Sequence, residues 1–186
     1  MLYIIKTDEG FINDCKQETN RMKEIFKGLI IIIVLIIQLT ILNSFTLQGI
    51  KPDLILILVI AFALLKGPEE GAIVGFFSGL LQDIFSIGLL GVHALIKIVT
   101  GFLCGLLKER MFAEHILFVI PLVTIFATIF KSGLMFLVLD AFGMEAANLI
   151  WSLKHISIPE ALYNGFLSPF IYLGIKKFLQ VIEEKL

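Results

Sequence analysis

The sequence predicts an all-α integral membrane protein with about six transmembrane helices. Apolar residues make up 58% of the 186 residues, whereas roughly half is usual for soluble domains. The mean hydropathy is +0.97, and the apolar residues come in long uncharged runs. The net charge of −1 provides no basic field, so no nucleic-acid partner is expected.

Residues 1–21 form a polar extension, and residues 22–186 form a single transmembrane domain. The extension lacks a helical signal, so a short disordered tail is one interpretation. The other is that translation begins at Met22, directly ahead of the first apolar run, and that residues 1–21 are a start-site overshoot. The intact mass of the native protein distinguishes the two.

The first span is predicted within Gly28–Ile50, which has no charged residue and is long enough to cross a hydrocarbon layer of ~30 Å. The next apolar runs, Leu54–Leu65 and Gly71–Gln82, are shorter, because each covers only about 18 Å as a helix. They form either two spans or a re-entrant hairpin, so four spans remain an alternative to six. The expected spans are residues 28–48, 52–66, 70–83, 92–107, 115–139 and 160–177.

A tight turn is predicted between the two short runs. Gly67 and Pro68 end the first helix, and Glu69 and Glu70 favour the N-terminus of the next helix through the helix dipole. The two runs therefore form a helical hairpin.

The longest polar break, Asp140–Glu160, is predicted to contain a short interfacial helix over Ala146–Leu153. Trp151 is expected to anchor this helix at the level of the lipid headgroups.

The lysines and arginines set the orientation. With six spans, both ends of the chain lie on one side, and only Lys51 and Lys154 fall on the other. The positive-inside rule makes the first side cytoplasmic, which predicts a multi-pass protein of the cell membrane with both termini in the cytoplasm. The residues expected there are Lys23, Lys27, Lys66, Lys108, Arg110, Lys176, Lys177 and Lys185.

Glycines recur every fourth residue at Gly71, Gly75 and Gly79, and Gly101 and Gly105 repeat this spacing in the next span. Glycine lacks a Cβ atom, so the backbone of a neighbouring helix can approach closely and gain dispersion contacts. Two copies on consecutive spans predict close packing within the chain. Packing against another protein is the alternative.

Three charged residues, Asp83, Lys97 and Lys131, are expected at membrane depth or at its edge. Such charges are costly and are candidates for a functional role, for example as a partner contact. The alternative is an internal ion pair between Asp83 and Lys97 that fixes the helices. Lys131 has no carboxylate at helical spacing. Its ammonium group must therefore pair with a group on another helix, face a water-filled cavity or extend to the membrane interface.

No catalytic, cofactor or metal site is predicted. Cys15 and Cys104 lie in different surroundings, and no Cys/His spacing suits a metal ion. A membrane enzyme would need two groups within hydrogen-bond reach of a substrate, and the spacing of the ionisable residues selects no reaction.

Several motifs nevertheless occur in the order typical of one family. They are Pro52-Asp53-Leu54, Leu64-Leu65-Lys66-Gly67-Pro68, the stretch Gly71–Asp83 of the form G-x₃-G-x₃-G-L-L-Q-D, Leu90-Gly91 and Gly101–Gly105. The chain resembles the rod shape-determining MreD family over Met22–Leu186, most specifically over Pro52–Phe112.

This resemblance implies a non-enzymatic scaffold of the cell-elongation machinery of rod-shaped bacteria, which controls cell shape and lateral peptidoglycan synthesis. It implies MreC as a partner and, through it, MreB, RodA and a class B penicillin-binding protein, besides membrane lipids. It also implies helices arranged similarly to those of the substrate-binding subunits of energy-coupling-factor transporters. The alternative is a small-molecule (vitamin) binding subunit of a transporter, with Lys97 or Lys131 in its pocket, and a co-purified stoichiometric vitamin would favour it.

Overall fold

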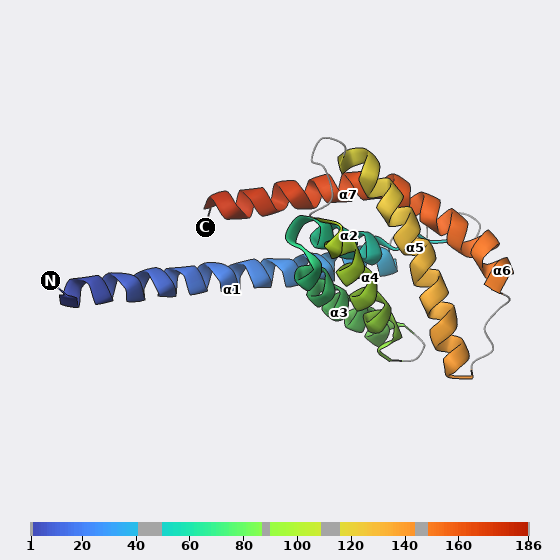
Figure 1. Ribbon diagram of the computed structural model, residues 1–186, viewed down its shortest axis with the longest axis horizontal. Helices are drawn as coiled ribbons and strands as arrows, with labels where there is room; N and C mark the ends of the chain where they lie inside the picture. The colour runs from blue at the N-terminus through green and yellow to red at the C-terminus, as the bar shows by residue number, and fades with distance from the viewer. Residues whose placement is uncertain (1, 41–49, 87–89, 109–115, 144–148, 186) are drawn as a thin grey trace.

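The computed structural model describes residues 2–40, 50–86, 90–108, 116–143 and 149–185. These residues are mostly helical, in agreement with the predicted all-α class. The helices form a bundle from which the first and last helices project (Figure 1). Their bounds are α1 (Leu2–Thr40), α2 (Leu54–Lys66), α3 (Pro68–Phe85), α4 (Val92–Leu106), α5 (Ile116–Ala141), α6 (Leu149–Ser152), a π-helical turn η3 (Leu153–Ser157) and α7 (Ile158–Lys185).

Helix α1 begins at Leu2, so the expectation of a tail without helix over residues 1–21 is wrong. That expectation rested on the polarity of the segment, and polarity alone does not oppose a helix. The segment contains Lys, Glu, Gln and Met, which have high helix propensity, and extending a formed helix avoids the cost of nucleation. The first half of α1 projects from the bundle (Figure 1), and α1 joins the core further along, where Ile31 and Leu35 are buried.

Helix α2 lies at the centre of the bundle. Asp53 caps its N-terminus, because the carboxylate accepts a hydrogen bond from the backbone N–H of Leu56 at 3.0 Å. Residues 55–64 are all buried, as expected for a helix that is apolar on every face. The helix ends at Gly67, whose φ of 112° suits glycine, and α3 starts at Pro68. The predicted tight turn is therefore present.

Helices α3 and α4 pack backbone against backbone. A Cβ atom at Gly75 would lie 2.7 Å from the carbonyl carbon of Lys97, and one at Gly79 would lie 2.7 Å from the backbone nitrogen of Ala94. Real Cβ atoms essentially never come within 3.0 Å of such atoms, so these positions fit glycine alone without a shift of backbone. The same restriction applies at Gly71, Gly101 and Gly105.

Helices α5 and α7 form a second pair, which packs against α2 and α4. On α5 the hydroxyls of Thr124 and Thr128 are buried and donate to carbonyl oxygens one turn earlier in the same helix. Gly165 of α7 packs against Ile125 of α5, because a Cβ atom added at Gly165 would lie 2.8 Å from Cγ1 of Ile125. The bundle thus consists of a glycine-packed block, α2–α4, and the α5–α7 pair.

Within the described residues, two helical stretches have the length and hydropathy of a membrane span, Leu117–Ala141 and Leu153–Ile182. Helices α2 and α4 are apolar but shorter. These properties agree with a helical membrane protein, whereas the count of six spans stays a prediction.

The interfacial helix predicted over Ala146–Leu153 lies partly outside the described residues. Its described part forms α6 and the first residue of η3, and the chain continues as helix into α7. Trp151 is exposed and stacks on His155, with ring centroids 5.0 Å apart. The turn η3 and residues 51–53, directly before α2, line the same cavity.

Candidate functional site

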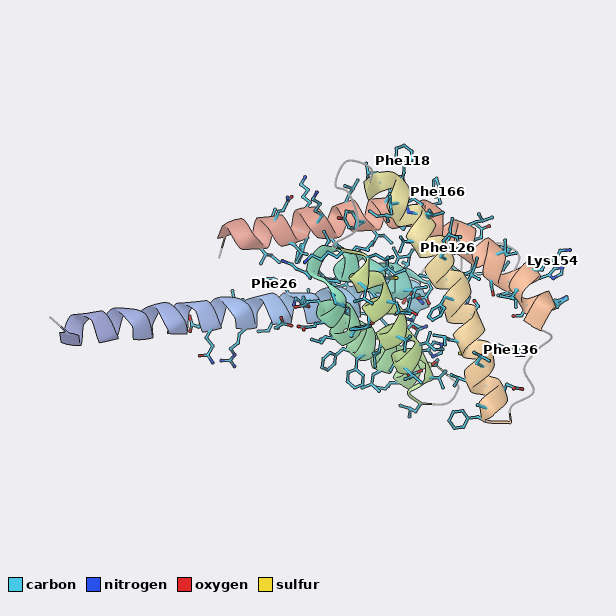
Figure 2. All side chains as sticks on the ribbon, viewed as in Figure 1. Phe26, Phe118, Phe126, Phe136, Lys154 and Phe166 are labelled. Carbon is cyan, nitrogen blue, oxygen red and sulfur yellow. The ribbon has the colours of Figure 1, made fainter. Side chains whose placement is uncertain are left out.

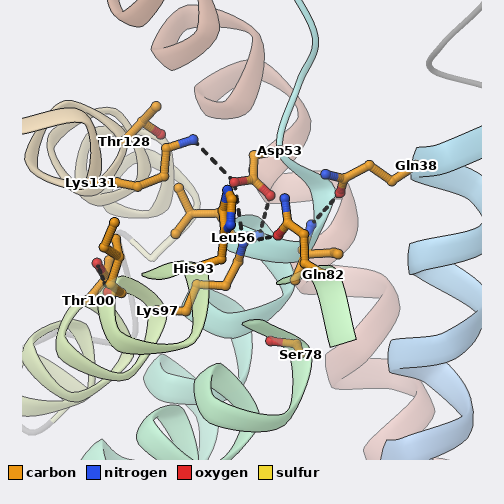
Figure 3. A network of polar contacts seen from close by, with 12 residues as sticks. Gln38, Asp53, Leu56, Ser78, Gln82, His93, Lys97, Thr100, Thr128 and Lys131 are labelled. Atoms are coloured by element: carbon orange, nitrogen blue, oxygen red, sulfur yellow. Dashed lines mark hydrogen bonds and ion pairs between the residues drawn. The ribbon is translucent and has the colours of Figure 1, made fainter. Parts of the chain in front are cut away.

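Four charged side chains, Asp53, Lys97, Lys131 and Glu160, meet inside the bundle, and we call them the charge cluster. The Oδ2 atom of Asp53 lies 3.2 Å from Nζ of Lys131 and 3.5 Å from Nζ of Lys97. Lys131 also forms an ion pair with Glu160. Figure 3 shows Lys131 reaching Asp53 from a neighbouring helix. The cluster thus joins the N-cap of α2 to α4, α5 and α7.

The charge cluster is largely shielded from solvent. The exposed fraction of the side chain is 1% for Lys97, 8% for Asp53, 18% for Lys131 and 12% for Glu160. Buried charges are costly unless they are paired and hydrogen-bonded, and here each ammonium group lies beside a carboxylate. The loss of one member would leave one charge of the opposite sign uncompensated.

Amide side chains add hydrogen bonds to the cluster. The Oε1 atom of Gln82 accepts a hydrogen bond from Nζ of Lys97. Asn164 accepts one from the backbone N–H of Asp53 at 2.9 Å and donates one to the hydroxyl of Thr128 at 3.1 Å. Asn164 therefore links the start of α2 to both α5 and α7.

Asp83 stands outside the charge cluster, and the ion pair with Lys97, which the sequence leaves open as an alternative, is not formed between these two described residues. Its carboxylate accepts hydrogen bonds from the backbone N–H groups of Gly91 at 3.0 Å, His93 at 3.1 Å and Ala94 at 3.1 Å. Its Oδ1 atom also lies 2.7 Å from Nδ1 of His93. Asp83 thereby caps the N-terminus of α4, whose first N–H groups lack partners within the helix. Lys97 lies about one turn further along α4, where it reaches the charge cluster instead.

A cavity of about 410 Å³ opens beside the charge cluster. It is lined by Gln38 near the end of α1, residues 51–53 directly before α2, the C-terminal part of α3, the start of α4, the second half of α5, and the end of α6 with η3 and the first turn of α7. These segments gather at one end of the bundle. At other ends of the same helices, Lys27 of α1 pairs with Glu70 of α3 at 2.9 Å, and Lys108 donates to the carbonyl oxygen of Lys66 at 3.1 Å.

The structure brings the predicted residues Lys97 and Lys131 together around Asp53, which the sequence prediction does not single out as a site residue. Glu160, Gln82 and Asn164 are missed as well. The one signal for Asp53 is its place directly before an apolar run, which is typical of a helix N-cap. Nothing in a single sequence pairs it with a lysine 78 residues away.

The chemistry of the arrangement is that of paired charges. Both carboxylates of the charge cluster lie against lysines. Within the described ranges, no three His, Cys, Asp or Glu side chains lie close enough together to hold a metal ion. What the arrangement can do is hold four helices together and present charge to the cavity.

Comparison with known proteins identifies the family. A family model described as rod shape-determining protein MreD matches residues 21–182. No curated protein and no solved structure matches the chain. The matched region contains the glycine interface, the charge cluster and Asp83. Because the match covers most of the sequence, the chain belongs to the rod shape-determining MreD family of membrane proteins.

Proposed function

We propose that this protein is a non-enzymatic scaffold of the bacterial cell-elongation complex that controls cell shape and lateral peptidoglycan synthesis. The observation that carries the proposal is the family match over residues 21–182, which implies a role in determining rod shape. The proposed partner is MreC, and through it the protein acts with MreB, RodA and a class B penicillin-binding protein.

The packing of α3 against α4 supports a scaffold role. Glycines bring the two backbones into direct contact, and α2 fills the remaining side of the block with buried side chains. Close-packed interiors resist deformation, so such a block keeps its outer surface unchanged when a partner binds. On this view the glycines, Lys97 and Lys131 fix the interior and do not contact a partner.

The outer faces of α5 and α7 carry large aromatic side chains that suit lipid or a partner helix. Phe118, Phe126 and Phe166 are 83%, 65% and 73% exposed. Figure 2 shows Phe118 pointing away from the bundle. Exposed apolar surface of this kind is covered in a membrane by lipid chains or by another transmembrane helix. We propose that lipid chains and a partner's transmembrane helix both contact the protein on these faces of α5 and α7.

We further propose six spans, arranged similarly to the substrate-binding subunits of energy-coupling-factor transporters, with both termini on the cytoplasmic side of the cell membrane. The contacts of Lys27 with Glu70 and of Lys108 with Lys66 support this, because segments expected in the cytoplasm meet one another. The first turn of α1 and the last turn of α7 also lie on the same side of the bundle (Figure 1). In this orientation the loops Lys66–Glu70 and Lys108–Glu114 face the cytoplasm, and the loops Asp83–Gly91 and Asp140–Glu160 face partners outside.

Affinity purification from membranes in a mild detergent tests the proposed role. We expect a MreC protein, anchored by a single span, to be captured together with peptidoglycan synthases. We also expect cells depleted of the protein to become round. Unchanged rods in a verified deletion strain would contradict the proposal.

A further inference from the structure

The cavity beside the charge cluster lies between two groups of helices. The end of α1, the residues before α2, the end of α3 and the start of α4 form the first wall, and α5, the end of α6, η3 and the first turn of α7 form the second. Its volume of about 410 Å³ falls within the ~300–1,000 Å³ of small-molecule sites. On the first wall, Gly79 packs against the backbone of His93 and Ala94, so the positions of Gln82 and His93 are fixed before a ligand enters.

The charges of the described lining balance one another. The ammonium groups of Lys97 and Lys131 lie against the carboxylates of Asp53 and Glu160, so the charge cluster holds two charges of each sign. Lys51 also lines the cavity, and it has an interaction partner of its own. A charged ligand would therefore bring a charge that no group of the lining compensates, and such a charge is costly away from water. The lining favours an uncharged ligand.

Two amide groups supply hydrogen-bond donors on the first wall. Gln82 uses its carbonyl oxygen to accept from Lys97, and Gln38 uses its own to accept from the backbone N–H of Ile55. Among the described residues, neither Nε2 group has a protein acceptor. Figure 3 shows both side chains directed toward Asp53, and both line the cavity. Oxygen atoms of a ligand would satisfy these donors.

His93 supplies an acceptor on the same wall. Its Nδ1 atom lies 2.7 Å from Oδ1 of Asp83, and an ionised carboxylate can only accept a hydrogen bond. In the neutral imidazole the proton is therefore on Nδ1, which leaves Nε2 as an acceptor. The side chain of His93 is 27% exposed and lines the cavity, and no residue in the described ranges donates to Nε2. Amide donors and an imidazole acceptor on one wall match a group that both accepts and donates, such as a hydroxyl.

The second wall is apolar beyond the charge cluster. Met135, Phe136 and Leu139 of α5 line it together with Leu153 and Ile156 of η3. The π-helical geometry of η3 is rare and occurs frequently at functional sites. A molecule that fits both walls has an uncharged polar head and a hydrocarbon body.

We propose that this cavity binds one small, uncharged amphiphile whose head carries hydroxyl groups, as in an ester of a polyol, and whose body is a hydrocarbon chain. The head lies against His93 and the amides of Gln38 and Gln82, and the body lies along Met135–Leu139 and η3. Because the ligand contacts both groups of helices, its binding stabilises their relative position. The inference goes beyond the scaffold role and holds whether or not that role is correct.

Native mass spectrometry of the full-length protein, released from phosphatidylcholine nanodiscs, tests the proposal. The uncharged probes are monooctanoylglycerol and monooleoylglycerol, the charged probes are octanoate and octyltrimethylammonium, and glycerol is the head without a body. We expect one saturable equivalent of an uncharged ester, bound at least about tenfold more tightly than either charged amphiphile. Binding of monooleoylglycerol alone indicates a membrane lipid as the source, and binding of monooctanoylglycerol indicates a soluble molecule. Equal affinity for a charged amphiphile, binding of glycerol without either ester, or no binding would overturn the proposal.

Variants of α5 locate the body of the ligand. Leu139→Trp fills the apolar part of the second wall and should weaken binding of the ester about tenfold. Leu137→Trp is the matched control, because Leu137 lies on the same helix with 62% of its surface exposed, and binding should be unchanged. If Leu139→Trp fails to fold, Ser132→Phe fills the same cavity, and unchanged affinity in the folded variant would place the ligand elsewhere.

Gln82→Glu tests the charge balance at the head. The new carboxylate can still accept from Lys97, but the change removes one amide donor and adds a negative charge to the lining. We expect monooctanoylglycerol to bind about fivefold more weakly and octyltrimethylammonium to bind about tenfold more tightly than in the unchanged protein. Unchanged affinities for both probes in the folded variant would show that the head does not lie on this wall.

Discussion

Gly71 of α3 and Gly101 of α4 occupy one another's side-chain space. A Cβ atom added at Gly71 would lie 2.5 Å from the carbonyl oxygen of Gly101, and one added at Gly101 would lie 2.7 Å from the carbonyl carbon of Gly71. This reciprocal contact lies in the first turn of α3, between the contacts of Gly105 with Pro68 and of Gly75 with Lys97. It also sets the position of Lys97, one turn earlier on α4, relative to the charge cluster.

Alanine at a glycine of this interface should destabilise the protein. In Gly75→Ala the new methyl group meets the backbone of Lys97, so the helices must separate, and we expect a loss of about 1–3 kcal/mol. Unfolding in detergent, followed by circular dichroism, measures it. Gly133→Ala is the control, because nothing lies within 4 Å of its added Cβ atom, and it should leave stability unchanged or slightly raised. Equal effects of the two variants would contradict the packing described.

Asp53→Asn should destabilise the bundle through charge and not through capping. Asparagine is also a good N-cap residue, so the start of α2 is preserved, but Lys97 and Lys131 lose the carboxylate between them. Removing one partner of a buried ion pair costs about 3–5 kcal/mol. Thermal unfolding in detergent measures the loss. Glu24→Gln breaks an ion pair whose carboxylate side chain is 63% exposed, and we expect a much smaller effect there.

Double-mutant cycles should distinguish Asp53, the partner of Lys97 in the structure, from Asp83, the partner that the sequence left open. Asp53 and Lys97 are 3.5 Å apart, so the cycle Asp53→Asn with Lys97→Met should give a coupling energy of about 0.5–3 kcal/mol. The cycle Asp83→Asn with Lys97→Met should give a coupling energy near zero. A larger coupling energy for Asp83 with Lys97 than for Asp53 with Lys97 would show that Asp83 is the partner of Lys97.

Asp83→Ala should destabilise the protein more than His93→Ala does. The carboxylate of Asp83 accepts from three backbone N–H groups at the start of α4, whereas His93 provides one side-chain contact to it. Leaving such donors without a partner costs about 1–3 kcal/mol each where they are buried. Hydrogen exchange at Gly91, His93 and Ala94 should accelerate in Asp83→Ala. Exchange that stays slow would show that another group caps the helix.

Cysteine labelling should place the turn at Gly67 in the cytoplasm. In a background without Cys15 and Cys104, Glu69→Cys should react with a thiol reagent only after the membrane is made permeable, because six spans put it on the inner side. Lys154 is exposed at the other end of the bundle (Figure 2), so Lys154→Cys should react in intact cells. A Glu69→Cys site that resists labelling under both conditions would favour the re-entrant hairpin and four spans.

The helical elements could be predicted from the sequence because uncharged runs, Gly67-Pro68 and the acidic first turn of α3 are local signals. The glycine spacing likewise predicted close packing, because the absence of a Cβ atom lets the backbone of a neighbouring helix approach. The charge cluster could not be predicted, because Asp53, Lys97, Lys131 and Glu160 come from four distant segments. The sequence allowed an ion pair between Asp83 and Lys97, but the carboxylate of Asp83 accepts hydrogen bonds from backbone N–H groups at the start of α4. Such backbone contacts leave no signal in the sequence. The helix over residues 2–21 was missed because polarity was weighed above helix propensity.

Replacement of a chromosomal copy by Gly75→Leu together with Gly79→Leu tests the central claim most directly, with Gly133→Leu as the matched control in open space. Cell shape and capture of MreC are measured in parallel at equal protein level. We expect round cells and lost capture for the double variant, and rods with normal capture for the control. Normal rods and normal capture with both leucines in place would contradict the claim that a glycine-packed helical block is what the elongation complex requires.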